Sequence, residues 1–168
     1  MVHSDFFESY RTVYWTTDNG RIMKAMMDGT GSVQIVSGLE DPTGIVVDHK
    51  SSKIFWVDVI AHKVQSSGLD GGVVTTVVEL SEFKPWGITM DADRLYVGNW
   101  KSTSELRSCT KTGGDMKTLY RGARPMQQLA MITARPPHTS RRNHCAGQTC
   151  SGGGICVLTA SSFRCLSP

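Results

Sequence analysis

The sequence lacks a long hydrophobic run and has little net charge. No apolar stretch approaches the ~18 residues that a membrane-spanning helix needs. The net charge of +3 is small, and the basic residues are scattered, so nothing favours a nucleic-acid partner or direct contact with a membrane surface. The first residues lack the basic start and apolar core of a signal peptide. No N-x-[ST] sequon predicts N-glycosylation either.

Motifs of the common enzyme classes are missing as well. The chain has no H-E-x-x-H, no G-x-S-x-G, no P-loop and no G-x-G-x-x-G that opens a helix. The five histidines are scattered along the chain, which favours surface positions over a metal site. We therefore expect no catalytic residues, no metal ligands and no cofactor.

What the chain does contain is a repeat. Tyr14, Phe55 and Tyr96 follow one another at intervals of 41 residues, and they define three copies over residues 13–53, 54–94 and 95–135. Each copy runs through an aromatic strand, a glycine turn, a β-rich run, a proline turn and a short apolar strand. The proline turns are Asp41-Pro42-Thr43-Gly44, Lys84-Pro85-Trp86-Gly87 and Arg124-Pro125-Met126-Gln127. A unit of four short strands in 40–45 residues has the size of a propeller blade.

The repeated motif resembles the YWTD repeat, also called the class B repeat, of low-density lipoprotein receptor relatives. The matching blade-motif residues are Tyr14, Trp15, Asp18, Phe55, Trp56, Asp58 and Tyr96. In that family, six repeats close a six-bladed β-propeller and an EGF-like module follows the last blade. The resemblance implies an all-β fold, with about three four-stranded blades of such a propeller over residues 1–135. It also implies that the motif aromatics pack on the neighbouring blade and that the motif aspartate hydrogen-bonds across the blade junction.

The three copies do not match the motif equally well. The second copy keeps the register of its aspartate, Asp58. In the first copy an extra Thr17 shifts Asp18 by one position, and a shift of one residue turns a side chain to the other face of a strand. Either a bulge corrects that shift or the junction bond is lost. In the third copy Asn99 replaces the aspartate, and residues 1–12 are a weak candidate for an inner strand preceding the first copy.

The carboxyl-terminal residues form a different kind of module. After a linker at 136–144, residues 145–168 hold four cysteines in the pattern C-x4-C-x5-C-x8-C. A segment this short cannot bury a core and needs covalent staples. Zinc is the rival interpretation, but the C-x2-C pairs typical of zinc sites are absent. The spacing resembles the first four cysteines of an EGF-like module, and that resemblance implies the pairs Cys145–Cys156 and Cys150–Cys165.

The resemblance also carries an expectation about function. It implies the extracellular, non-catalytic ligand-binding part of a receptor in ligand uptake or in Wnt co-receptor signalling. Its partners would be extracellular protein ligands and the remaining blades of the parent propeller. The alternatives are a secreted matrix protein of nidogen type and a six-bladed calcium lactonase, against which the cysteine-rich tail argues. Because that tail indicates secretion and no signal peptide is present, we expect a part of a longer chain, with a cytosolic protein as the other possibility.

Three side chains are candidates for ligand contact. Trp86 and Met126 lie at the proline entries to inner strands, and Trp100 follows a second strand. Exposed aromatic side chains at such places serve as interface anchors. Trp86 could instead fill a blade junction, and both roles stay open here. Because three blades do not close a ring, we expect the isolated chain to be marginally stable, aggregation-prone or dimeric.

Overall fold

The chain is described by a computed structural model. The structure describes residues 11–99, 104–123 and 129, together with the backbone of 155–158 and 163–166. In these ranges the regular elements are β-strands, and none of the described residues forms a helix with the length and hydropathy of a membrane span. Two compact units result, residues 1–132 and 133–168, and each is described by itself.

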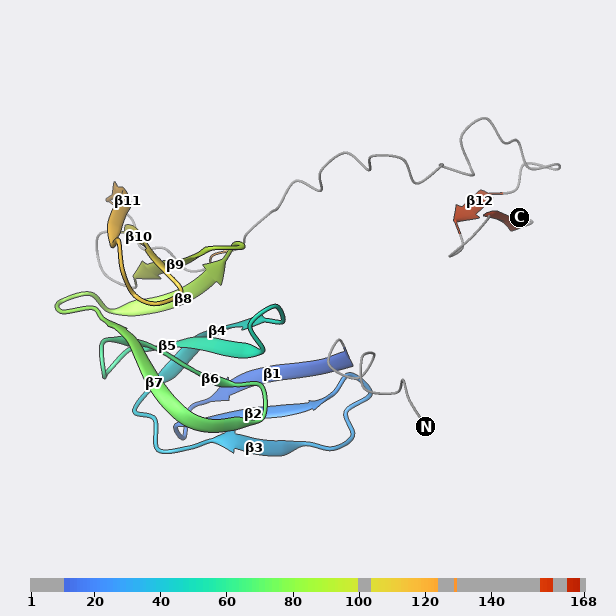
Figure 1. Cartoon of the computed structure of the whole chain (residues 1–168), viewed down its shortest axis with the longest axis horizontal. Coiled ribbons are helices and arrows are strands. Elements are labelled where there is room, and N and C mark those ends of the chain that lie inside the picture. The colour runs from blue at the N-terminus through green and yellow to red at the C-terminus, as the bar shows by residue number, and fades with distance from the viewer. Residues whose placement is uncertain (1–10, 100–103, 124–128, 130–154, 159–162, 167–168) are drawn as a thin grey trace. The chain divides into compact units, whose positions relative to one another are not determined.

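The first unit contains three antiparallel sheets that follow one another along the chain (Figure 1). The first sheet has three strands in the order β1-β2-β3, and the second and third have four each, in the orders β4-β5-β6-β7 and β8-β9-β10-β11. The bounds are β1 Thr12–Thr17, β2 Arg21–Met26, β3 Val33–Val36, β4 Pro42–Asp48, β5 Lys53–Asp58, β6 Lys63–Gly68, β7 Gly71–Glu79, β8 Pro85–Met90, β9 Arg94–Asn99, β10 Ser104–Thr110 and β11 Lys117–Gly122. This is the all-β blade architecture expected from the repeat.

The sheets are offset from the sequence repeats by one strand. The second and third repeats begin at the second strand of a sheet, and the last strand of the repeat before each of them is the first strand of that sheet. Thus β4 closes the first repeat but pairs with β5 of the second, with Val46 opposite Phe55. In the same way, β8 closes the second repeat and pairs with β9, with Thr89 opposite Tyr96. Consecutive repeats are therefore joined by backbone hydrogen bonds as well as by side-chain packing.

Two hydrophobic cores lie where the sheets meet. The first junction, between the first and second sheets, buries Ile22, Val36, Ile54 and Trp56. The second junction, between the second and third sheets, buries Phe55, Val57, Val64, Leu80, Phe83, Ile88, Leu95, Val97 and Cys109. Because side chains alternate across a strand, β5 contributes Ile54 and Trp56 to one junction and Phe55 and Val57 to the other. The second sheet is thus covered on both faces, and residues 54–57 of its second strand are all apolar.

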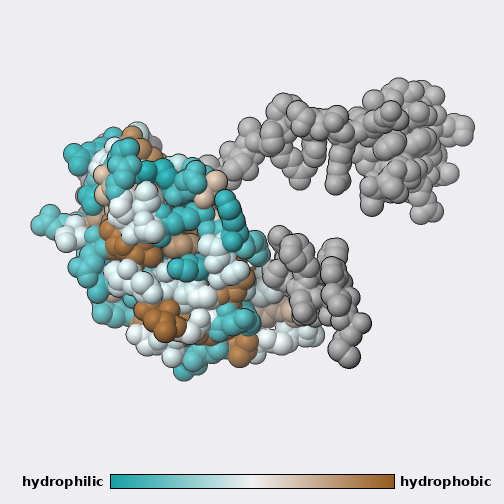
Figure 2. Space-filling model, in the orientation of Figure 1, coloured by the Kyte–Doolittle hydropathy of each residue, from teal (hydrophilic) through white to brown (hydrophobic). Residues whose placement is uncertain are grey.

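The outer strand β7 carries two exposed valines, Val73 and Val74. It is an edge strand of its sheet, and Val73 is 85% exposed. The face drawn in Figure 2 shows hydrophobic patches set among polar side chains. A β-prone apolar strand with an open edge is a site for association with another chain.

The second unit contains a two-stranded antiparallel sheet, β12 (Ile155–Leu158) and β13 (Phe163–Leu166). The backbone register places Cys156 opposite Cys165. Cys145 and Cys150 lie outside the described residues. The EGF-like module and the pairs Cys145–Cys156 and Cys150–Cys165 therefore stay predictions.

Candidate functional site

The candidate ligand surface lies where the inner strands of consecutive sheets begin. A cavity of about 410 Å³ is lined there by Thr43, Gly44, Ile45, Trp86, Gly87, Ile88 and Leu129. These residues lie in or just after the proline turns predicted to lead into inner strands. The inner strands of the second and third sheets, β4 and β8, thus form one wall.

Close backbone approach shapes this wall. A Cβ atom at Gly44 would lie 2.9 Å from both Ile88 N and the carbonyl oxygen of Trp86, so no larger residue fits there without a backbone shift. A Cβ atom at Gly87 would lie 3.6 Å from Leu129 N. Leu129 therefore lies beside β8 in the same way that β8 lies beside β4. The glycine in the Pro-x-Gly turn is explained by this contact between neighbouring inner strands.

Threonine side chains join the inner ends of the three sheets. Thr16 Oγ1 on β1 donates to the carbonyl oxygen of Thr43 on β4 at 2.7 Å. Thr43 Oγ1 in turn donates to the carbonyl oxygen of Trp86 on β8 at 2.9 Å. Each of these bonds gives a strand-end carbonyl a side-chain donor from the preceding sheet.

Of the three candidate contact residues, only Trp86 lies within the described residues. Its side chain is half-buried and lines the cavity, and its role in ligand contact stays a prediction. Trp100 and Met126 lie outside the described residues.

Asp58 ends β5 and holds the segment that connects the first sheet to the second. Its side chain is 1% exposed. Oδ2 accepts a hydrogen bond from Glu40 N at 2.9 Å, and Oδ1 accepts from Asp41 N at 3.1 Å and from Ala61 N at 2.9 Å. One buried carboxylate therefore satisfies three backbone donors that flank the junction.

The first copy has no such carboxylate at this position. The pairing of β1 with β2 is continuous and places Thr17 opposite Arg21, as Asp58 stands opposite Lys63. No bulge corrects the shift, so Asp18 falls in the following turn, where it is exposed and makes no side-chain hydrogen bond within the described part of the chain. Of the two alternatives posed by the extra Thr17, the described residues show the lost bond.

Asn99 stands at this position in the third copy. It is 3% exposed, and its Oδ1 accepts from Glu105 N at 2.7 Å. An amide oxygen has one acceptor atom where a carboxylate has two. The degraded copy therefore keeps part of the arrangement around Asp58.

The motif aromatics occupy different environments in the three copies. Tyr14 packs against the core of the first junction, and Phe55 lies in the core of the second. Burial raises the pKa of Tyr14. Tyr96 is half-buried, and its hydroxyl donates to Asp91 Oδ2 at 2.7 Å, which raises the pKa of Tyr96. Trp56 is fully buried with Nε1 donating to Gln65 Oε1 at 3.2 Å, whereas Trp15 is only half-buried.

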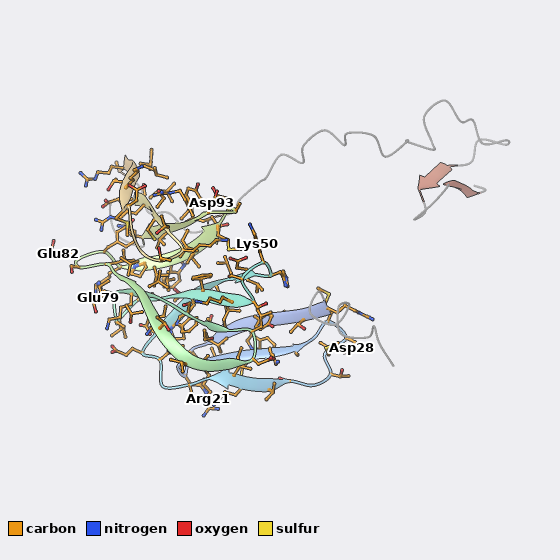
Figure 3. All side chains as sticks on the ribbon, viewed as in Figure 1. Arg21, Asp28, Lys50, Glu79, Glu82 and Asp93 are labelled. Atoms are coloured by element: carbon orange, nitrogen blue, oxygen red, sulfur yellow. The ribbon has the colours of Figure 1, made fainter. Side chains whose placement is uncertain are left out.

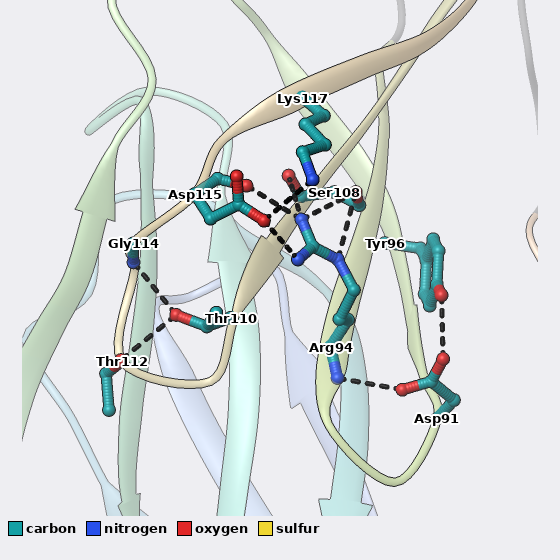
Figure 4. Close-up of polar contacts among 9 residues, drawn as sticks. All are labelled: Asp91, Arg94, Tyr96, Ser108, Thr110, Thr112, Gly114, Asp115 and Lys117. Atoms are coloured by element: carbon teal, nitrogen blue, oxygen red, sulfur yellow. Dashed lines mark hydrogen bonds and ion pairs between the residues drawn. The ribbon is translucent and has the colours of Figure 1, made fainter.

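Arg94 organises the outer part of the third sheet (Figure 4). Its Nη1 lies 2.8 Å from Asp115 Oδ2, and its Nη2 donates to Ser108 Oγ at 3.0 Å. Lys117 lies 2.9 Å from the same Asp115 oxygen, and the Lys117 and Arg94 contacts hold the pKa of Asp115 below its usual value. This arginine fixes the β10–β11 turn onto β9.

Two ion pairs bridge the junctions. Lys24 of β2 contacts Asp70 in the β6–β7 turn across the first junction. Lys111 Nζ lies 2.7 Å from Asp48 Oδ2 across the second, and both of these side chains are largely buried. Burial raises the pKa of Asp48, but hydrogen bonds from Lys111 and Ser51 outweigh burial and leave it below its ordinary value.

Several of these residues were not predicted from the sequence. Thr43, Asp48 and Arg94 lie outside the YWTD motif, and their partners are distant in sequence. The sequence offered one signal for the role of Asp48. An aspartate recurs at the end of consecutive inner strands, as Asp48 and Asp91, and both carboxylates accept backbone hydrogen bonds from residues that follow them. Within the described ranges, no group of three His, Cys, Asp or Glu side chains is placed to hold a metal ion.

No protein-family model matches the chain. Among curated proteins, it is 25% identical to low-density lipoprotein receptor-related protein 5 of Mus musculus, over 86% of this chain and 9% of the relative. It is 32% identical to vitellogenin receptor Yl of Drosophila melanogaster, over 87% of this chain and 7% of that receptor. The chain thus spans less than a tenth of these relatives.

Solved structures give the same picture of the fold. A chain of the nidogen/laminin complex matches with a TM-score of 0.63 and 26% identity, over 71% of this chain and 48% of that one. A putative TolB from Agrobacterium tumefaciens matches with a TM-score of 0.60 and a luciferin-regenerating enzyme with 0.57. Their identities of 12% and 11% show a shared fold alone.

Proposed function

Since the chain is related to the low-density lipoprotein receptor-related proteins, we propose that it is an extracellular, non-catalytic ligand-binding part of such a cell-surface receptor. The observation that carries this proposal is the 25–32% identity to two receptors over 86–87% of the chain. The wall formed by β4 and β8 is the proposed contact surface, with Trp86 as its anchor. The remaining blades of the parent propeller and extracellular proteins are the proposed partners.

The role of the parent receptor divides into two possibilities. Similarity to the vitellogenin receptor supports uptake of a protein ligand, and similarity to low-density lipoprotein receptor-related protein 5 supports Wnt co-receptor signalling. Surface plasmon resonance tests both, using the full chain secreted from eukaryotic cells and immobilised, with vitellogenin and a Wnt protein as analytes. Binding of one analyte assigns the corresponding role, whereas a folded chain that binds neither analyte contradicts both roles.

Trp86 provides the matched variant for this experiment. Loss of a central aromatic anchor typically costs at least about 2 kcal/mol of binding free energy, so Trp86→Ala should weaken binding by at least about thirtyfold. Val73→Ala alters an exposed residue of β7 outside the cavity and should leave binding unchanged. Equal affinities for the two variants would remove Trp86 from the contact surface.

A matrix protein of nidogen type is the second candidate. The 26% identity to a chain of the nidogen/laminin complex favours it. A laminin fragment used as a third analyte separates this candidate from the receptor, because binding to laminin alone would assign the matrix role.

The extracellular location has an independent test in the cysteines. Peptide mapping of the secreted chain without reduction should find Cys145–Cys156 and Cys150–Cys165 linked and Cys109 free. Cys109 is fully buried, and burial raises the pKa of its thiol, which keeps it unreactive. Reduced cysteines throughout, or bound zinc, would reopen the cytosolic and enzymatic alternatives.

A further inference from the structure

Trp86 lies in a β-bulge rather than in a regular stretch of β8. Between the pairs Pro85–Asn99 and Gly87–Gly98, β8 advances by two residues while β9 advances by one, and Trp86 is the extra residue. A bulge bends its strand and re-aims the side chain of the extra residue. The alternation of side chains along β8 therefore does not fix the direction of the indole ring, and contacts with other strands must do so.

The preceding sheet supplies such a contact through Thr43. Thr43 Oγ1 donates to the carbonyl oxygen of Trp86 at 2.9 Å, and this bond restrains the rotation of the Trp86 peptide unit. The backbone dihedrals of a residue decide which of its side-chain rotamers are allowed. A hydroxyl that holds the Trp86 carbonyl therefore limits the directions in which the indole ring can point into the cavity.

Close packing beside this bond gives the Trp86 peptide little room to turn. A Cβ atom at Gly44 would lie 2.9 Å from the Trp86 carbonyl oxygen and 2.9 Å from Ile88 N. The backbone of β4 thus lies against the bulge next to the Thr43 hydroxyl. Thr43 and Gly44 act from the same side, one as a hydrogen-bond donor and the other as a close steric neighbour.

Thr43 is itself held from the first sheet. Its carbonyl oxygen accepts from Thr16 Oγ1 at 2.7 Å. Strand β4 also carries an irregularity like that of β8, because its register with β5 shifts between Pro42 and Ile45. Two hydroxyl-to-carbonyl bonds therefore run in series from β1 through β4 to β8. Thr16 does not line the cavity, so an influence of Thr16 on the cavity must pass through Thr43.

The wall of the cavity is uncharged. Among the described residues that line it, none carries a charged side chain. The charged residues labelled in Figure 3, Glu82 and Asp93 among them, lie at the periphery of the sheets and do not line the cavity. Binding at this wall then depends on shape and apolar contact, which makes the direction of a large aromatic side chain decisive.

We propose that Thr43 is a positioning residue for the Trp86 anchor, and that Thr16 supports Thr43 from the first sheet. This inference rests on the proposed function, because it concerns how the same contact surface is held ready for a ligand. When a ligand binds one conformation only, its dissociation constant rises in inverse proportion to the fraction of molecules in that conformation. Thr43 and Thr16 keep that fraction high before a ligand arrives.

The unliganded chain provides the first test. The full chain is labelled with fluorotryptophan, and fluorine nuclear magnetic resonance follows its four tryptophans. The resonance that is missing from Trp86→Phe identifies Trp86. We expect Thr43→Val, which keeps the shape of the side chain but removes the hydroxyl, to shift or broaden that resonance, and Thr43→Ser to restore it. The resonance of the fully buried Trp56 should stay unchanged.

Two outcomes of this test would overturn the inference. A Trp86 resonance that is the same in Thr43→Val as in the unaltered chain would show that the hydroxyl does not hold the anchor. An equal change at Trp56 would show that the substitution loosens the second sheet as a whole. Neither outcome depends on finding a ligand, so failure of the inference is distinguishable from failure of the proposed function.

Binding measurements extend the test to the contact surface. Vitellogenin, a Wnt protein and a laminin fragment are passed over each immobilised variant. Loss of the hydrogen bond should leave about one molecule in five with Trp86 in the binding conformation, so Thr43→Val should weaken binding about fivefold. Thr16→Val should weaken binding about twofold, because it removes a bond one step further from Trp86. If no analyte binds, the proposed function fails and the fluorine measurement still decides the inference.

Thr17 provides the matched control. It follows Thr16 on β1, and its hydroxyl donates to Asn19 Oδ1 at 2.6 Å within its own hairpin. Thr17→Val should leave both the Trp86 resonance and the affinity unchanged. A loss of affinity as large in Thr17→Val as in Thr16→Val would mean that either change merely loosens β1, and it would overturn the series of bonds. Unaltered affinity in Thr43→Val would overturn the role of Thr43.

Discussion

The first and second sheets carry the same aromatic motif on the same strand, but their surroundings differ. On β5, Trp56 is fully buried and Asp58 accepts three backbone hydrogen bonds. On β1, Trp15 is half-buried and Thr17 takes the place of the aspartate. The second sheet has a neighbour on both faces among the described residues, and the first has one. The motif thus stabilises the fold through the sheets on either side of it, and four pairs of substitutions test this contrast.

The largest effect is expected at the tryptophans. Trp56→Ala should lower the free energy of unfolding by about 3–5 kcal/mol, because it leaves a cavity in a closed core. Trp15→Ala removes a half-buried side chain and should cost roughly 1–2 kcal/mol. Urea denaturation followed by circular dichroism measures both. Equal losses would show that the first sheet is covered as completely as the second.

The aspartates should give the next largest difference. Asp58→Ala leaves three backbone donors without their acceptor in a buried site, which should cost about 3 kcal/mol. Asp18→Ala changes an exposed turn residue and should alter stability by less than about 0.5 kcal/mol. Urea denaturation followed by circular dichroism measures the loss of stability in both variants. A loss at Asp18 similar to that at Asp58 would contradict the lost junction bond.

The turn glycines isolate the close approach of neighbouring sheets. Gly71 and Gly29 both have positive φ, 86° and 84°, so alanine is strained at either position by about 1–2 kcal/mol. At Gly71 the new methyl group would also overlap the carbonyl oxygen of Ile35, which should add about 1–3 kcal/mol. Thermal melts of the two alanine variants give the difference. Equal losses of stability in the two variants would contradict the close approach at Gly71.

The smallest effect is expected at the ion pairs. Lys111→Met removes a partner of the buried Asp48 and should cost about 1–3 kcal/mol. Asp70 is 89% exposed, so Lys24→Met should cost less than about 1 kcal/mol, as exposed pairs do. Chemical denaturation at neutral pH compares the two. A larger loss of stability for Lys24→Met than for Lys111→Met would contradict the view that the buried pair contributes more.

The Asp48 contacts also make stability depend on pH. Because the folded-state pKa of Asp48 is lowered, its stabilisation is present above the unfolded-state pKa of about 3.9 and is lost as pH falls through the lower folded value. Lys111→Met should raise the pKa of Asp48 and reduce this acid-dependent loss. Unfolding midpoints of the unaltered chain and of Lys111→Met, measured between pH 6 and pH 2, test whether the variant loses less stability in acid.

The sequence allowed the strands and the fold class to be predicted, because strand periodicity and proline turns are local signals that recur three times. The fate of Asp18 was left as two alternatives, since a bulge and a lost bond both fit an insertion of one residue. The bonds of Thr43 and Arg94 could not be predicted, because their partners are set by how sheets and turns meet in space. Repetition shows which positions correspond, but it does not show which of them acquire a neighbour.

The offset between repeat and sheet has a consequence for synthesis. As each repeat leaves the ribosome, its last strand belongs to a sheet whose other strands have yet to be made. At about 5–20 residues per second, β4 and β8 gain their first partner, β5 or β9, within roughly two seconds, whereas the rest of the sheet takes several seconds to be made. The nascent chain therefore exposes an incomplete, apolar sheet at each of these steps, which gives chaperones that bind extended segments a recurring target.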